Sequence, residues 1–97
     1  MRERLQKLKG WTVENGRLEK EFRFQNFARA MVFVNKIVNP IEEYQNYPRI
    51  LITYDRIHVS LFTNEAGAIT VMDFEMAQQM EGLAGTPQEN GVEFIKA

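Results

Sequence analysis

The 97-residue sequence contains no cysteine, a single histidine and no long apolar run. The absence of cysteine excludes disulfides, thiolate nucleophiles and cysteine-ligated zinc. It is compatible with a reducing compartment, and we expect the protein in the cytoplasm. No segment approaches the roughly 20 apolar residues that cross a bilayer. The N-terminal sequence MRERLQKLKG also lacks the apolar core of a signal peptide or anchor. We therefore expect no membrane association.

An excess of charge of one sign is also missing. Twelve Lys and Arg residues stand against thirteen Asp and Glu residues, for a formal net charge of -1. Nucleic-acid-binding domains usually carry a basic surplus or patch, so we expect no nucleic-acid partner. The single histidine, His58, has no companion in an HxxxH pattern or acidic cluster, and we predict no metal site.

The length fits one small domain, which we place at residues 1–84, followed by a C-terminal tail at 85–97. Residues 2–9 predict a short helix that ends at Gly10. The pair Asn15-Gly16 tolerates the positive φ angles of a type I′ turn, so a β-hairpin is predicted around it. This turn pairs Val13 with Leu18.

A second hairpin is predicted within PRILITYDRIHVSLFTN, with Asp55 and Arg56 as its turn. One face of its strands is then apolar and belongs to the core: Ile50, Ile52, Tyr54, Ile57, Val59 and Leu61. The opposite face carries Leu51, Thr53, His58, Ser60 and Phe62. Because this second face is neither core-like nor clearly solvated, we interpret Leu51, His58 and Phe62 as a possible protein-contact face.

Two longer helices complete the pattern. Apolar residues at helical spacing predict a helix from Phe27, capped by Gln25 or Asn26. Its predicted stripe is Phe27, Ala30, Met31, Val34, Ile37 and Val38, widened by Ala28 and Phe33. Pro40 ends the regular pattern, with IEEY as a candidate extra turn.

The last helix begins at the Thr70/Asp73 capping-box spacing. It has Met72, Met76 and Met80 at intervals of four, interpreted as core, and is expected to close at Gly82 and Gly85. The predicted order is α-β-β-α-β-β-α. It indicates an α+β fold with a four-stranded antiparallel sheet and helices packed on one face.

The stretch NYPRILITYDRIHVSLFTNEAGAITVMDFEMAQQM resembles the pterin-4a-carbinolamine dehydratase family. That family has a His-His-Pro turn, a strand hairpin with a Tyr before its turn, a Thr-His pair, a glycine-rich loop and a final helix with an early Asp. The matching residues here are Pro48, Tyr54, Leu61, Thr63, Thr70, Asp73 and Ala77. The resemblance extends from about Gly10 to Met80.

The resemblance implies dehydration of 4a-hydroxytetrahydropterins in tetrahydrobiopterin recycling, without a metal or other cofactor and with three histidines in acid-base roles. All three are replaced here. Asn46 and Tyr47 stand at the His-His positions, and Asn64 stands at the third. Asparagine exchanges no useful proton, and tyrosine is a weak acid with an unperturbed pKa of about 10. The resemblance implies that Asn46, Tyr47, Pro48, Asn64 and Asp73 are the residues that would hold a pterin.

Two hypotheses follow. In the first, the chain is a catalytically impaired relative that binds a protein, because the family includes a dimerisation cofactor of a homeodomain transcription factor and a Rubisco assembly factor of carboxysome bacteria. In the second, it remains a dehydratase with Tyr47 as the acid. Binding of a pterin without turnover lies between them. We favour the first, and we expect a homodimer or homotetramer.

Overall fold

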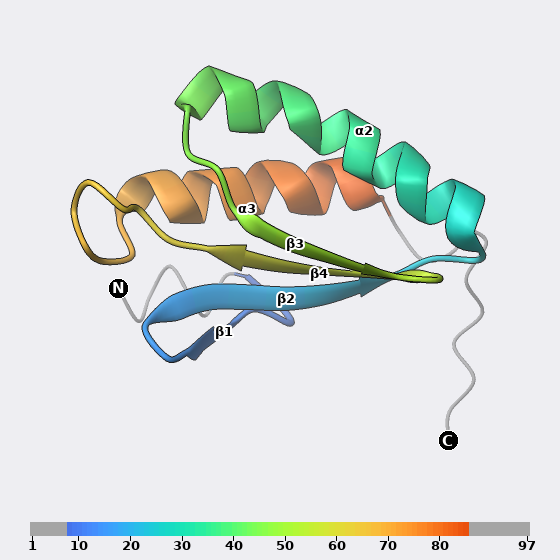
Figure 1. Cartoon of the computed structure of the whole chain (residues 1–97), viewed down its shortest axis with the longest axis horizontal. Helices are drawn as coiled ribbons and strands as arrows, with labels where there is room; N and C mark the ends of the chain where they lie inside the picture. Colours follow the sequence, from blue (N-terminus) through green and yellow to red (C-terminus); the bar gives the residue numbers. More distant parts are fainter. Residues whose placement is uncertain (1–7, 86–97) are drawn as a thin grey trace.

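The computed structural model describes residues 8–85, which form a four-stranded antiparallel sheet with two helices on one face (Figure 1). The elements are β1 (Thr12–Glu14), β2 (Arg17–Arg23), α2 (Phe27–Tyr44), β3 (Arg49–Thr53), β4 (Arg56–Leu61) and α3 (Val71–Ala84). The strands lie in the order β1-β2-β4-β3. The predicted α+β class is confirmed. The predicted helix at residues 2–9 falls outside the described residues, except for Leu8 and Lys9, which are not helical.

The first hairpin forms as the sequence predicts. Asn15 and Gly16 have φ angles of 52° and 75°, the left-handed values that a type I′ turn requires. Val13 pairs with Leu18 across this turn. Leu18 is fully buried, whereas Val13 is 43% exposed because it lies on the short edge strand β1.

The second hairpin turns one residue earlier than predicted. Tyr54 and Asp55 form its turn, with Tyr54 at φ 52°, so the predicted turn at Asp55 and Arg56 is wrong. The backbone N–H of Phe24 donates to the Asp55 carbonyl at 2.8 Å, which ties the turn to the end of β2. A contact of this kind joins distant segments, and a local turn pattern carries no sign of it.

The error in the turn does not change which face of the sheet each side chain of the hairpin lies on. Ile52 pairs with Ile57 rather than Val59, a shift of two residues that keeps each side chain on its original face. Ile57 and Val59 are fully buried under the helices. The predicted burial of Ile52 and Tyr54 is wrong, since they are 40% and 67% exposed. Ile52 lies on the edge strand β3, and Tyr54 lies in the turn.

Asn26 is the N-cap of helix α2, and its side-chain oxygen accepts the Arg29 N–H at 2.9 Å. The helix continues through Pro40 to Tyr44. The candidate extra turn after Pro40 therefore forms. The buried stripe is rotated from the predicted one and consists of Ala30, Phe33, Ile37, Pro40 and Ile41. Phe27 and Val38, both predicted to be buried, are 50% and 47% exposed.

Replacing Asn26 with alanine should lower the free energy of unfolding by about 1 kcal/mol, the usual cost of losing a side-chain N-cap. Urea denaturation followed by circular dichroism measures this change. Asn35→Ala is the matched control, because Asn35 is exposed in the middle of the same helix. Equal losses in the two variants would contradict the capping role.

Thr70 is the N-cap of helix α3, as predicted, and its backbone N–H donates to the Asp73 carboxylate at 2.8 Å. The predicted stop at Gly82 is wrong, because the helix includes Gly82 and ends at Ala84. Gly85, at φ 72°, is its C-cap.

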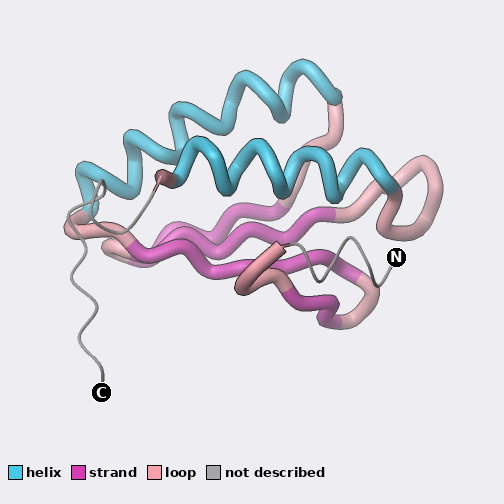
Figure 2. Tube along the Cα trace, turned by 180° about the vertical axis from the view of Figure 1, so that it is seen from behind, coloured by secondary structure: helices cyan, strands magenta, loops and turns pink. Residues whose placement is uncertain are grey.

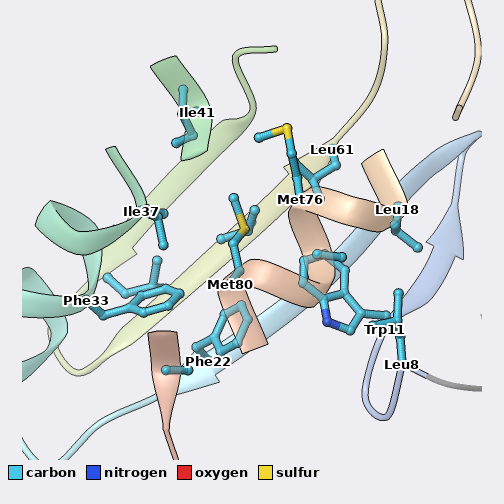
Figure 3. Close-up of a cluster of buried hydrophobic side chains, with 14 of the residues drawn as sticks. Leu8, Trp11, Leu18, Phe22, Phe33, Ile37, Ile41, Leu61, Met76 and Met80 are labelled. Atoms are coloured by element: carbon cyan, nitrogen blue, oxygen red, sulfur yellow. The ribbon is translucent and has the colours of Figure 1, made fainter. Parts of the chain in front are cut away.

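The core lies between the helices and the sheet. Met76 and Met80 of α3 are fully buried there, as predicted, together with Phe33 of α2 and Phe22 of β2 (Figure 3). The Phe22 and Phe33 rings lie 4.7 Å apart between centroids. Trp11 meets Phe22 edge-on and donates from Nε1 to Glu81 Oε1 at 2.8 Å. Within residues 8–85, no helix covers the other face of the sheet (Figure 2).

Candidate functional site

The QNYP turn follows α2 directly and brings one of its side chains into the interior. Gln45 adopts a left-handed conformation, with φ 52°, and its N–H donates to the Glu42 carbonyl at 3.3 Å. This turn ends the helix and directs Asn46 inward, where it is only 7% exposed. Pro48 then favours an extended conformation at Tyr47 and leads the chain into β3.

Asp73 is the centre of the site. It is fully buried on the first turn of α3 and forms hydrogen bonds with three neutral groups. Asn46 Nδ2 donates to its Oδ1 at 2.7 Å, while the Thr63 hydroxyl and the Thr70 N–H donate to its Oδ2 at 2.7 and 2.8 Å. A buried carboxylate is tolerated when such donors surround it. The amide of Asn46 is therefore engaged by Asp73.

Thr63 and Thr70 extend this hydrogen-bond network to the loop that carries Asn64, the third predicted histidine position of the family. Thr63 Oγ1 lies 2.8 Å from Thr70 Oγ1. Because the Thr63 hydroxyl already donates to Asp73, Thr70 is the donor between them. Thr63 and Ala68 form a bridge that closes the loop at residues 64–67. Asn64 begins this loop and is exposed, one residue away from the network.

Tyr47 lies outside this buried cluster. Its side chain is 57% exposed, and the negative charge of nearby Glu42 raises its pKa above the ordinary value of 10. The sign follows from repulsion, because a phenolate beside a carboxylate is disfavoured. Tyr47 is thus an even weaker acid than an isolated tyrosine. Glu42 and Glu43 are both exposed and do not form the buried carboxylate pair that acid-base work would need.

Removing the charge of Glu42 should lower the pKa of Tyr47 back toward its ordinary value. The substitution Glu42→Gln keeps the shape of the side chain and removes the repulsion that favours the neutral phenol. A pH titration of the assigned Tyr47 ring resonances measures the shift. Glu43→Gln is the control and should leave the titration unchanged. A Tyr47 midpoint that does not respond to Glu42→Gln would refute this electrostatic assignment.

His58 lies on the opposite side of the sheet from this cluster. It alternates along β4 with Ile57 and Val59, which face the helices, so its side chain points to the uncovered face. Its Nε2 lies 2.6 Å from Glu19 Oε1. His58 therefore cannot replace an imidazole at Asn46 or Asn64.

The uncovered sheet face, hereafter the open face, carries a polar network that the sequence did not indicate. Ser60 donates to Glu19 Oε2 at 3.2 Å and accepts from Arg17 Nε at 2.5 Å. Arg17 also donates to the Ser60 carbonyl at 3.0 Å, and its guanidinium lies 5.2 Å from the centre of the Phe62 ring. Burial, and then the charge of Arg49, lower the pKa of Arg17. This network covers Ser60, which is 4% exposed.

The open face also exposes apolar side chains. Leu51, which pairs with His58 across the hairpin, is 64% exposed, and Phe62 is half-buried beside Arg17. The three predicted contact residues thus lie on one face. Their role in binding stays a prediction.

The structure therefore groups the predicted site residues in two places. Asn46 and Asp73 are in direct contact. Tyr47 and Pro48 follow Asn46 in the chain, and Asn64 follows Thr63, which donates to Asp73. Leu51, His58 and Phe62 lie on the open face. The sequence indicated Thr70 as the capping-box partner of Asp73 and as a family match, but Thr63 only as a family match. The Thr70 contact follows from the capping-box spacing, whereas the Thr63 contact spans ten residues and depends on the packing of the loop against α3.

Chemically, the Asp73 cluster consists of a carboxylate with amide, hydroxyl and backbone N–H donors around it. Within residues 8–85, no three His, Cys, Asp or Glu side chains come close enough together to hold a metal ion. None of the helices described is both long and apolar enough to cross a membrane.

Comparison with known proteins places these features in one family. The family model described as pterin 4 alpha carbinolamine dehydratase matches residues 1–83. A relative from Trichormus variabilis is 42% identical over 71 residues, which cover 73% of this chain and 76% of the relative. Another, from Thermomicrobium roseum, is 40% identical over 80 residues, with coverage of 82% and 86%. Both are named for pterin-4-alpha-carbinolamine dehydratase.

Solved structures with a similar fold include a member of the same family. The transcriptional coactivator/pterin dehydratase from Brucella melitensis superposes with a TM-score of 0.83 at 31% identity, covering 88% of this chain and 93% of that one. A pterin dehydratase-like protein identified as a RuBisCO assembly factor of the alpha-carboxysome gives 0.64 at 19% identity, covering 78% and 88%. At that identity the second likeness shows the fold alone. The family match and the curated relatives show that this chain belongs to the pterin-4-alpha-carbinolamine dehydratase family.

Proposed function

We propose that this chain is a catalytically impaired member of the family that acts through protein binding, as an assembly factor. The observation that carries this proposal is the Asn46–Asp73 contact. At the first of the family's histidine positions, the side chain is an amide held at 2.7 Å by a buried carboxylate. It positions the turn but has no proton to exchange at neutral pH.

The chemistry of dehydration explains why an amide in place of an imidazole impairs catalysis. Hydroxide is a poor leaving group and must be protonated as its C–O bond breaks, while a ring nitrogen loses a proton. A group with a pKa near 7 serves both steps well. Asn46 and Asn64 cannot do so, and Tyr47, with its pKa raised by Glu42, is a poor acid. Each lost acid or base typically costs about 10²- to 10⁴-fold in rate.

Protein binding is supported by the open face. It combines the exposed Leu51 with Phe62 and the fixed charges of Arg17 and Glu19. A related fold serves a protein identified as a RuBisCO assembly factor. We place this protein in the cytoplasm as a homodimer or homotetramer, in which the edges of neighbouring sheets would join and broaden this face.

The catalytic part of the proposal is tested by an assay on freshly generated 4a-hydroxytetrahydropterin. We expect the purified protein to dehydrate it at a rate close to that of buffer alone, because no described side chain near Asp73 can protonate the leaving hydroxide. A family member that retains the three histidines is the positive control. Turnover well above the buffer rate would overturn the proposed impairment.

The binding part is tested on RuBisCO assembly. Co-expression of this chain with the large and small subunits should raise the yield of assembled enzyme, and Leu51→Glu should remove the gain because it buries a charge in the contact. Asn35→Glu, at an exposed position on α2 away from the open face, is the control. An unchanged yield with the unmodified chain would exclude this partner.

A second candidate is an active dehydratase. It is favoured by the relatives at 40–42% identity that carry the dehydratase name, and by the retained Pro48 and Asp73. Here Tyr47 would act as the acid, while Asn46 and Asn64 position the pterin. Tyr47→Phe separates the two candidates. Loss of measurable turnover in that variant would support the dehydratase, whereas an unchanged rate near that of buffer supports impairment.

A further inference from the structure

The Asn15-Gly16 turn of the first hairpin belongs to neither the Asp73 cluster nor the open face. It joins β1 to β2 at one edge of the sheet (Figure 1). Both residues are exposed, and a Cβ added at Gly16 would meet no atom within 4 Å. The turn is therefore open to water and leaves room for the Asn15 side chain to approach the backbone of Gly16.

Two groups that can react with each other in this turn are free of hydrogen bonds. They are the Asn15 side-chain amide and the Gly16 backbone N–H, neither of which has a hydrogen-bond partner within residues 8–85. The turn is closed instead by the pairing of Glu14 with Arg17. Because glycine has no Cβ, the Gly16 nitrogen is also less hindered than any other backbone N–H.

The other asparagines in the described part of the chain lack these conditions. All five are followed by residues whose side chains hinder attack by the next nitrogen: Asn26, Asn35, Asn39, Asn46 and Asn64. The fold protects two of them further, since the Asn46 amide donates to Asp73 at 2.7 Å and Asn26 caps α2. Among residues 8–85, the reaction is therefore expected at Asn15.

We propose that Asn15 is a site of spontaneous deamidation, with Gly16 as the nucleophile. The Gly16 nitrogen loses its proton and bonds to Asn15 Cγ, which closes a succinimide ring. The side-chain nitrogen takes up a proton and leaves as ammonia. Water then opens the ring at either carbonyl and gives aspartate or isoaspartate. This modification does not depend on the proposed function.

The reaction proceeds through brief opening of the turn. Attack needs rotation of the backbone between Asn15 and Gly16, which the paired hairpin restricts. Strand β1 favours opening, because it has only three residues, all of them exposed, and pairs with β2 alone. Local opening at such an edge needs far less free energy than global unfolding.

The isoaspartate product changes the hairpin, because its main chain runs through the former side chain and gains a CH₂ group. A two-residue type I′ turn cannot accommodate this extra atom. The pairing of Val13 with Leu18 is then lost. Arg17 follows the turn directly and donates to the Ser60 carbonyl at 3.0 Å, so the change also reaches the open face.

Peptide mass spectrometry of the full chain tests the reaction. After incubation at mildly alkaline pH, trypsin should release residues 10–17, GWTVENGR, together with two separable peptides that have the mass of the acid. Gly16→Ala should convert far more slowly, because its Cβ hinders attack. The second Asn-Gly pair, at 90–91, lies outside the described residues and in a different tryptic peptide. If Asn15 stays unmodified while the free peptide GWTVENGR converts completely, the proposal is overturned.

Low concentrations of urea separate opening of the turn from unfolding of the whole chain. The rate of conversion should stay constant below the unfolding transition, because opening of the turn exposes little surface. A rate that rises in proportion to the globally unfolded fraction would overturn the local route.

The effect on the hairpin has a matched control in Asn15→Asp, which carries the charge of the product on a normal backbone. The purified isoaspartate form should lose the dispersed amide resonances of Thr12 and Val13, whereas Asn15→Asp should keep them. Retention of these resonances in both proteins would contradict the loss of pairing.

Discussion

Replacing Asn46, Tyr47 and Asn64 together with histidine is expected to raise the rate of 4a-hydroxytetrahydropterin dehydration by about 10²- to 10⁴-fold over the unmodified chain. At position 46, the N–H of the imidazole can take over the donor role to the buried Asp73 carboxylate, which now receives the asparagine amide at 2.7 Å. A carboxylate in that place orients the ring and stabilises its protonated form.

A gain in dehydration rate could also come from nonspecific acid-base catalysis by any imidazole added to the protein, so a control for this effect is needed. The matched control carries three histidines at exposed positions outside the site, at Asn35, Thr53 and Gln78. We expect this control to match the unmodified chain in the same assay. If the variant with histidine at positions 46, 47 and 64 folds but dehydrates at the same rate as the unmodified chain, the site has diverged beyond these three side chains. The loss of three histidines would then not be enough to describe how this protein differs from a dehydratase.

The second large effect concerns stability. Asp73→Ala should lower the free energy of unfolding by about 3 kcal/mol or more, because it leaves three donors without their acceptor. Each unsatisfied buried donor costs about 1–3 kcal/mol, and the effects within one network are not additive. Such a loss is a large part of the total stability of a domain of this size, roughly 5–15 kcal/mol. Chemical denaturation measures it.

A milder variant keeps this prediction testable if Asp73→Ala does not fold. Thr63→Val removes one donor to Asp73 and one acceptor for Thr70, and we expect a loss of about 1–2 kcal/mol. Gln78→Ala, on the exposed side of α3, should stay within about 0.5 kcal/mol of the unmodified chain. A Thr63→Val loss no larger than that of the control would mean that the network does not stabilise the fold.

The sequence predicted the helices and strands better than it predicted which of their side chains are buried. The apolar spacing of α2 predicted a helix correctly but placed its buried stripe on Phe27 and Val38, which are exposed. Spacing defines a stripe, whereas the sheet and α3 decide which side of it is covered. The same holds for Ile52, whose apolar character could not reveal that β3 is an edge strand.

In the candidate site, too, the sequence indicated which residues are present but not which of them are in contact. From the family resemblance, the sequence predicts that Asn46, Tyr47 and Asn64 stand at the histidine positions of the family, and this prediction rests on residue identity alone. It could not reveal that Asn46 contacts Asp73, 27 residues away, or that Glu42 raises the pKa of Tyr47. Those facts depend on the left-handed turn at Gln45 and on the packing of α2 against α3.

By itself, the sequence determined the α+β class, the Asn15-Gly16 turn, the start of α3 and the family resemblance. Each depends on residue types at short or fixed spacing. Only the tertiary structure decided the turn at Tyr54 and Asp55, the burial of the Asp73 cluster and the pairing of His58 with Glu19, 39 residues apart. The reason is physical: hydrogen bonds between distant segments and the burial of side chains depend on how the elements pack together. Local sequence patterns do not encode that packing.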